Sequence, residues 1–264
     1  MKPTLNHRRT AFTLTDLFVV IIILVICYWG IADLSATAGA KRKAQRISCQ
    51  NNLKEIGTAY VLWADDHGGR TPASESATRG GWSDLLTNAD QGENCWTNYA
   101  VLADALGRDA RRVICPADDR TAAAEFVTNT TQYEYDLRAS YFHSNSNVSY
   151  FVGVSANTNS PRSLLAGDRN LGGGTAPDSE YGFSPASGKG NDVAVPIAGP
   201  ASWSLKMHSD GNPAGAGNIL LGDGHVQQVS TASFNKDWLR NAAPTTNWPA
   251  GHVPATPSIR VVLP

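Results

Sequence analysis

The apolar residues of this chain gather in one long run near its start. From Phe12 to Ile31 the sequence reads FTLTDLFVVIIILVICYWGI, 20 residues in which Asp16 is the single charged one. At about 1.5 Å rise per residue, such a helix spans about 30 Å, the thickness of the hydrocarbon core of a bilayer. The pattern predicts a membrane-crossing helix over 12–31, in which Asp16 is a costly charge that needs a partner.

The hydrophobic pattern then changes to that of a helix with one apolar face. Leu53, Ile56 and Tyr60 recur at helical spacing, with polar residues between them. Gly68-Gly69, which favour the end of a helix, follow directly. We expect an exported amphipathic helix over 32–67.

Beyond the helix, short segments rich in β-branched and aromatic residues alternate with loops rich in Gly, Asn and Ser. RSLLAG at 162–167 is typical of a buried strand. We predict a globular head over 68–240 and, because 241–264 contains five prolines, an extended tail there. The predicted fold class is α+β: a long N-terminal membrane-to-head helical spine, followed by a loop-rich head with an antiparallel sheet.

Composition excludes some functions. The net charge of −1 gives no electrostatic case for nucleic-acid binding, and 42% hydrophobic residues support a real core. The chain contains no G-x-S-x-G, H-E-x-x-H or G-x-x-x-x-G-K-[ST] motif. We therefore expect a protein that is not an enzyme.

The residues before the apolar run indicate orientation. Lys2, His7, Arg8 and Arg9 precede it without an acidic residue, so this end is expected in the cytoplasm and the rest outside. Two ordinary interpretations fit: a signal peptide cleaved after Ala38-Gly39-Ala40, or a plain membrane anchor.

A third interpretation rests on AFTLTDL at 11–17, which resembles the type IV prepilin signal. The resemblance implies that 1–11 is a leader, that a prepilin peptidase cuts between Ala11 and Phe12, and that the new amine is methylated. It also makes Asp16 the carboxylate that pairs with the amine of a neighbouring subunit. Such pairing neutralises two charges that are each costly in lipid.

Later segments extend the resemblance to pseudopilin-like proteins of bacteria with elaborate envelopes. They are CQNNLKEIGTAYVLWADDHGGRTP at 49–72, ICPADD at 114–119 and NILLGDGHVQQV at 218–229. The resemblance implies a pilin-like subunit of an envelope filament or secretion pseudopilus, single-pass in the inner membrane with a periplasmic head. The implied partners are the peptidase, other subunits, an inner-membrane assembly platform and the lipid bilayer.

The four cysteines divide by location. Cys27 lies in the apolar run, whereas Cys49, Cys95 and Cys115 lie beyond it, without a CxxC or zinc-ligand spacing. The resemblance favours a Cys49–Cys115 disulfide, and Cys95–Cys115 is the local alternative.

One short segment suggests both a turn and a site. Asp223-Gly224 stands between alternating segments and predicts a type I′ hairpin. His208, Asp223 and His225 are also a possible transition-metal set. Related secretion pseudopilins are known for a calcium-stabilised loop, which makes calcium a further possibility.

The carboxylates available for calcium are Asp168, Asp192, Asp210 and Asp223, but no EF-hand loop is present. Our expectation is solvated loop carboxylates and no cofactor.

Two other functions remain open. One is a secreted or anchored domain that binds an extracellular glycan, with Trp82, Trp96 and Trp203 as surface platforms. The other is an exported hydrolase of unfamiliar type.

Overall fold

The computed structural model describes most of the chain: residues 13–84, 95–124, 126, 142, 144–154, 156–184, 195–197, 200–209, 212–239 and 259–264. For 29–36, 195–197, 239 and 259–260 it describes the backbone alone. The chain forms two compact units, Met1–Lys43 and Ala44–Pro264, which are described separately below.

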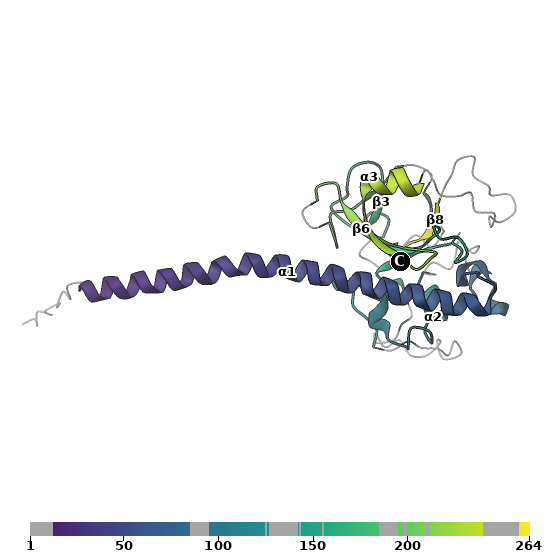
Figure 1. Cartoon of the computed structure of the whole chain (residues 1–264), viewed down its shortest axis with the longest axis horizontal. Coiled ribbons are helices and arrows are strands. Elements are labelled where there is room, and N and C mark those ends of the chain that lie inside the picture. The colour runs from purple at the N-terminus through teal and green to yellow at the C-terminus, as the bar shows by residue number, and fades with distance from the viewer. Residues whose placement is uncertain are drawn as a thin grey trace, which may run out of the picture. The chain divides into compact units, whose positions relative to one another are not determined.

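Helix α1 (Leu14–Asp66, 53 residues) begins in the first unit and ends in the second (Figure 1). Its end is fixed by glycine: Gly68 and Gly69 have φ of 65° and 80°, and the Gly69 amide donates to the Ala64 carbonyl at 2.8 Å. Left-handed backbone of this kind is nearly free of strain in glycine and commonly terminates helices. The predicted stop at Gly68-Gly69 is therefore confirmed.

The predicted fold class, with its membrane-to-head spine, is wrong. In the part of the chain that the structure describes, no helix combines the length and the apolar character needed to cross a membrane. The boundary between the two units also falls inside α1, after Lys43, so only the second part of α1 belongs to the same unit as the head.

A six-stranded antiparallel sheet forms the centre of the second unit, in the order β4-β8-β1-β2-β6-β7. The strands are β1 (Tyr150–Gly153), β2 (Leu164–Asp168), β4 (Val195–Ile197), β6 (Ala216–Leu221), β7 (Val226–Ser230) and β8 (Ile259–Val262). A separate pair joins β3 (Leu171–Gly173) to β5 (Ala201–Trp203). The strand expected at 162–167 is β2.

The segment predicted as an extended tail contributes β8 to this sheet. β8 pairs with β1 and β4, and Val261, Val262 and Leu263 are fully buried. The prediction for 241–264 rested on proline content, whereas the Ile-Arg-Val-Val run at its end has the β-branched residues that strands favour.

Short helices complete the second unit. They are α2 (Cys95–Val101), α3 (Thr231–Ser233), the π-helical turn η7 (Phe234–Leu239), and the 3₁₀ turns η1 (Pro72–Ser74), η2 (Ala77–Arg79), η4 (Ala110–Val113) and η6 (Asn145–Asn147).

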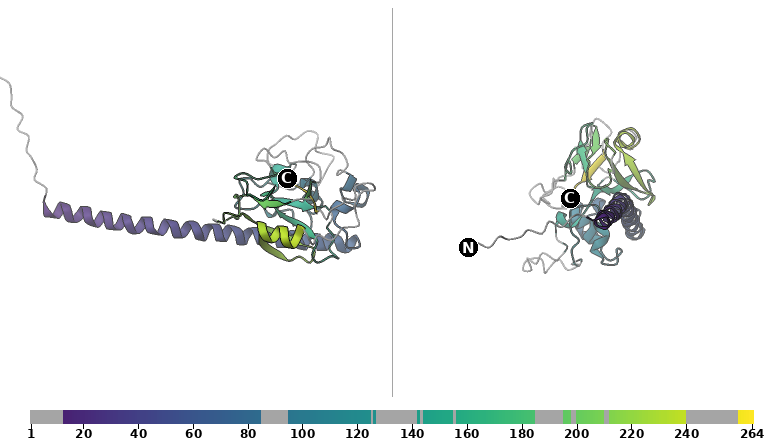
Figure 2. Two further views of the ribbon diagram at one scale, coloured as in Figure 1. Left: turned by 90° about the horizontal axis from the view of Figure 1, so that it is seen from above. Right: turned by 90° about the vertical axis from the view of Figure 1, so that its left-hand side faces the viewer.

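The sheet separates two hydrophobic cores. On one side, Leu53, Ile56 and Tyr60 of α1 pack with α2 and with Tyr150 and Val152 of β1. On the other side, Phe151 of β1 belongs to a second cluster, which contains Leu171, Trp203, Phe234 and Trp238. Successive residues of β1 thus face opposite cores, as the pleat of a strand requires. Figures 1 and 2 show the sheet and α2 on different sides of the C-terminal part of α1.

The second unit also buries a charged pair. Arg169, directly after β2, has a fully buried side chain that forms a bidentate contact with Asp118, with both N–O distances 2.7 Å. Its guanidinium also contacts Asp119 at 2.6 Å and lies 3.5 Å from the centre of the Tyr181 ring. Burial raises the pKa of Asp118, but its bonds to Arg169 outweigh burial and bring the pKa to about 2.

Candidate functional site

Three buried donor groups meet between α1 and the sheet. They are the Cys49 thiol, the Cys115 thiol and the His208 imidazole, whose ligand atoms all lie within 4.8 Å of one another. Cys49 is on α1, Cys115 follows η4, and His208 lies between β5 and β6. Each is at most 1% exposed. Among the described residues, no other group of three or more His, Cys, Asp and Glu side chains has its ligand atoms this close together.

Hydrogen bonds fix both thiols. Cys115 Sγ lies 3.0 Å from His208 Nε2, and the Ala117 amide donates to the same sulfur at 3.4 Å. Cys49 Sγ donates to Asp168 Oδ1 at 3.2 Å and accepts from the Tyr150 hydroxyl at 3.3 Å. Every member therefore has a polar partner inside the core, as buried polar groups need.

Asp168 is a fully buried carboxylate at this site. Its Oδ2 accepts from the Asn218 backbone amide at 2.7 Å and from the Asn218 side-chain amide at 2.9 Å. Burial raises the pKa of Asp168, and the nearby His208 opposes that rise. A cation at this position would favour the charged carboxylate.

The two thiols differ in electrostatic environment. Burial, the hydrogen bond with Cys115 and the Asp168 charge raise the pKa of Cys49 well above its usual value. Burial also raises the pKa of Cys115, but hydrogen bonds with Cys49 and His208 outweigh it, and the net pKa is lowered. Cys115 is thus the more readily ionised thiol of the pair.

Local sequence explains how these side chains come together. Cys49, Leu53 and Ile56 follow the i, i+4, i+7 spacing of one helix face, so Cys49 enters the core with the hydrophobic stripe. In the sheet, Tyr150 stands directly opposite Asp168 on the neighbouring strand. The register of β1 and β2 therefore brings a hydroxyl and a carboxylate to the same thiol.

Sequence reasoning proposed other groupings for these residues. The structure places Cys49 and Cys115 together as free thiols, so a disulfide between them remains a prediction. Cys95 is free and lies elsewhere in the core, with its Sγ 3.4 Å from the Tyr150 carbonyl oxygen. His208 is buried, whereas Asp223 and His225 are exposed, so this predicted trio is not assembled.

The Asp223-Gly224 hairpin is present between β6 and β7, but its turn differs from the predicted type I′. Gly224 has φ of 78°, and neither Gly222 nor Asp223 has positive φ. The Gly224 amide donates to the Leu221 carbonyl at 2.9 Å, and the Leu221 amide donates to the His225 carbonyl at 3.0 Å. This is a three-residue loop whose last position is left-handed, a common hairpin connection.

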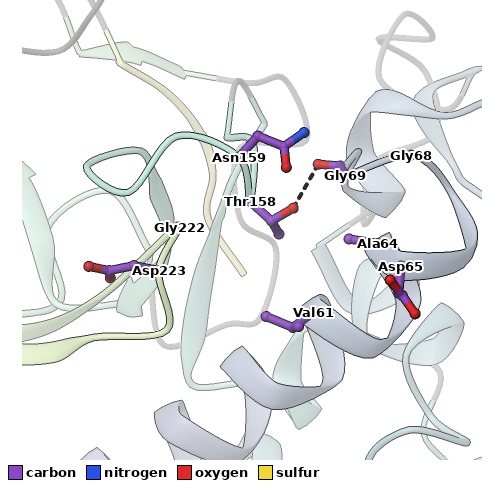
Figure 3. A pocket seen from close by; sticks show the side chains of 9 residues that line it. All are labelled: Val61, Ala64, Asp65, Gly68, Gly69, Thr158, Asn159, Gly222 and Asp223. Atoms are coloured by element: carbon purple, nitrogen blue, oxygen red, sulfur yellow. Dashed lines mark hydrogen bonds between the residues drawn. The ribbon is translucent and has the colours of Figure 1, made fainter.

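The hairpin loop borders an open cleft of about 420 Å³ (Figure 3). The end of α1 lines its other wall with Val61, Ala64 and Asp65. Figure 3 shows the carboxylates of Asp65 and Asp223 on opposite sides of the cleft, pointing away from each other. The Asp223 carboxylate accepts from the His225 amide at 2.9 Å, which assigns it a role in the turn. The two carboxylates do not converge on a calcium position.

Asp16 lies at the start of α1 and is exposed. Its Oδ2 accepts from the Thr13 amide at 3.0 Å and from the Thr13 hydroxyl at 2.8 Å, and the Asp16 amide in turn lies 3.3 Å from that hydroxyl oxygen. This reciprocal arrangement is a capping box, which satisfies amide groups that lack a partner in the first turn. The carboxylate therefore has a local structural role that sequence reasoning missed, although the T-x-x-D spacing could have indicated it.

Other predicted residues are placed as follows. Trp82 and Trp203 are buried, at 1% and 0% exposure, so neither ring is a surface platform for a glycan. Trp96 is half-buried and packs edge-on against Phe142. Ala11, Phe12, Asp192 and Asp210 lie outside the described residues.

The combination of Cys49, Cys115, His208 and Asp168 was also missed by sequence reasoning. Its members come from four distant segments, with 119 positions between Cys49 and Asp168 and 93 between Cys115 and His208. Compared with family models, curated proteins and solved structures, the chain has no match.

Proposed function

We propose that the protein is a structural subunit of an envelope filament or secretion pseudopilus, cut by a prepilin peptidase between Ala11 and Phe12. In this proposal the first part of α1 assembles with the same part of other subunits. The observation that carries it is the exposed apolar surface of that part of the helix. No residue is assigned a catalytic role.

The apolar side chains lie on every side of α1 near its start. Phe18, Val19, Val20 and Ile21 are consecutive and 44–62% exposed, and consecutive residues of a helix point in directions about 100° apart. A helix that is apolar all round is buried in its working state. Burying each such side chain fully contributes about 1.5–3 kcal/mol, so a bundle of like helices is strongly favoured over exposure.

The capping arrangement is compatible with a second role for Asp16. Both bonds from Thr13 end on Oδ2, so Oδ1 is able to accept from the amine of another subunit. Once such a pair is removed from water, loss of one partner leaves a single buried charge, which is more costly than loss of both. Asp16 would then fix the register between neighbouring helices.

The predicted partners follow from this role. They are the prepilin peptidase, other filament subunits, an inner-membrane assembly platform and a lipid bilayer, whereas nucleic acid is not expected as a ligand. A glycan-binding role is less favoured because Trp82 and Trp203 are inside the cores.

A pair of variants tests the assembly charge. Asp16→Asn removes the charge but keeps an oxygen that can cap the helix, whereas Thr13→Val removes the capping hydroxyl and keeps the charge. We expect Asp16→Asn to be incorporated poorly beside wild-type subunits and Thr13→Val to be incorporated nearly normally, as measured in the sheared filament fraction of producing cells. Equal incorporation of both variants would show that Asp16 acts as a cap alone.

Intact mass of the purified protein tests processing. We expect a chain that begins at N-methylated Phe12. A chain that begins at Lys41 would instead identify a conventionally secreted protein and overturn the proposed function.

A further inference from the structure

We propose that Cys49, Cys115 and His208 bind a zinc ion, with Asp168 as the fourth donor, and that this ion fastens α1 to the head. The site is independent of filament assembly, because all four residues belong to the second unit. It also differs from the His208, Asp223 and His225 set that the sequence suggested.

The spacing of the donor atoms suits a tetrahedral ion. Zinc binds sulfur at about 2.3 Å and imidazole nitrogen at about 2.0 Å, which places tetrahedral donors about 3.5–3.8 Å apart. The three donor atoms lie within 4.8 Å of one another, and the closest described pair, Cys115 Sγ and His208 Nε2, is 3.0 Å apart. Binding therefore needs adjustments of about 1 Å in the spacing of these three donor atoms.

The chemistry of the donors selects the ion. Thiolate and imidazole ligands favour zinc over calcium or magnesium, which prefer oxygen. Asp168 Oδ1 lies 3.2 Å from Cys49 Sγ, so a carboxylate directly contacts one of the three donor residues and is our candidate for the fourth ligand. Two thiolates and one carboxylate carry three negative charges beside a neutral imidazole, and a divalent cation offsets two of them.

Protons and electrons balance without another reactant. Each thiol loses one proton to solvent when zinc binds, and no group is oxidised or reduced. The Tyr150 hydroxyl and the Asn218 amides already donate to Cys49 Sγ and to Asp168, and such outer hydrogen bonds orient metal ligands.

The position of the site indicates a structural role. It is buried and takes its donors from α1, from the segment after η4, from the end of β2 and from the β5–β6 loop. Four protein donors leave no position for substrate, as in closed structural zinc sites. The ion would join parts of the chain that are 93 and 119 positions apart.

A Cys49–Cys115 disulfide is the competing outcome. It would use the two sulfurs, but it gives no role to the His208 imidazole that contacts Cys115. It would also leave the Asp168 carboxylate buried without a cation. The joint placement of all four groups is better explained by a metal ion.

Metal analysis of the full chain, purified without chelator or reductant, tests the proposal. We expect about one zinc per chain in the wild type and in Cys95→Ser, which removes a buried thiol outside the site. We expect less than a tenth of that zinc in Cys115→Ser and in His208→Gln.

Cobalt binding to the wild-type chain gives a second measurement, which does not depend on how well any variant folds. Wild-type chain stripped with chelator and then given cobalt should show thiolate-to-cobalt charge-transfer absorption, and its melting temperature should rise by several degrees. In Asp168→Asn we expect cobalt affinity to fall at least tenfold.

Two results would overturn the proposal. One is wild-type chain that holds no zinc and shows no thiolate–cobalt absorption. The other is a mass two hydrogens lower, with a peptide that links Cys49 to Cys115, in protein purified under non-reducing conditions.

Discussion

The two ends of α1 differ in how their apolar side chains are placed. Near its start, Leu17, Phe18 and Ile21 are 49–62% exposed, and apolar residues cover the whole circumference. Near its end, Leu53 and Ile56 are fully buried and polar residues fill the other faces. One helix therefore contains a part whose apolar face is packed inside the second unit and a part whose apolar side chains are exposed.

The charged residues follow the same division. Asp16 is exposed and is bonded to Thr13 within its own first turn. Arg169 is fully buried and is paired within the second unit with Asp118. A buried charge needs a counter-charge within the same fold, whereas an exposed charge is solvated by water and can pair with another molecule later.

The largest effect is expected from breaking the internal pair. Arg169→Met should lower the free energy of unfolding by about 3–5 kcal/mol, because it leaves the buried Asp118 without its cation. Lys206→Met is the matched control: its contact with Glu180 joins side chains that are 41% and 70% exposed, and such pairs contribute at most about 1 kcal/mol. Urea unfolding followed by tryptophan fluorescence measures both. Similar losses in the two variants would contradict the view that the buried pair is the important one.

The next largest effect on stability is expected from an isoleucine-to-alanine change, made once at each end of α1. Ile56→Ala should cost about 2–5 kcal/mol of stability, because the fully buried side chain leaves a cavity. Ile22→Ala changes the same chemistry at a side chain that is 52% exposed and should shift stability by less than about 0.5 kcal/mol. For filament assembly we expect the opposite order: Ile22→Ala should be incorporated less efficiently than wild type. If Ile22→Ala unfolds as easily as Ile56→Ala, the start of α1 has an internal partner after all.

Much of the local structure could be predicted from the sequence, because it depends on neighbours in the chain. The spacing of Leu53, Ile56 and Tyr60 predicted the buried helix face, and Gly68-Gly69 predicted its end. The hairpin at Asp223-Gly224 was predicted for the same reason, although not its turn type. These features are set by period and by glycine conformation, which a single sequence displays.

Long-range arrangement could not be predicted in this way. Nothing in the spacing of Cys49, Cys115, Asp168 and His208 indicates that four separate segments meet, because the register of β1 and β2 and the packing of α1 decide it. The same holds for β8, because the prediction for 241–264 considered only its five prolines. The glycan-binding alternative required Trp203 at the surface, but Gly217 allows the chain to pack closely on its ring: a Cβ there would lie 2.4 Å from Trp203.

A smaller effect is expected where α1 meets the β6–β7 hairpin. Gly224→Val should lower the free energy of unfolding by about 1–3 kcal/mol, because a β-branched residue resists the φ of 78° at this position. The space itself is open, since a Cβ on Gly224 would meet nothing within 4 Å. Gly224→Asn is therefore the control, because asparagine tolerates left-handed backbone, and it should cost less than valine does. Thermal melting of the two variants distinguishes conformational strain from steric clash, and equal melting temperatures would contradict the argument.

The smallest effect is expected one residue earlier and separates the turn from a cation site. Asp223 is exposed, and its Oδ1 accepts from the His225 amide at 2.9 Å. Asparagine offers an equivalent oxygen, so Asp223→Asn should change stability by less than about 0.5 kcal/mol. Asp223→Ala removes that acceptor and should cost somewhat more, by about 0.5–1.5 kcal/mol. Melting curves of wild type and both variants with and without added calcium check these values. If calcium raises the melting temperature of the wild type and Asp223→Asn abolishes that rise, Asp223 is a cation ligand. The exposed β6–β7 hairpin would then be a binding site in addition to the apolar start of α1.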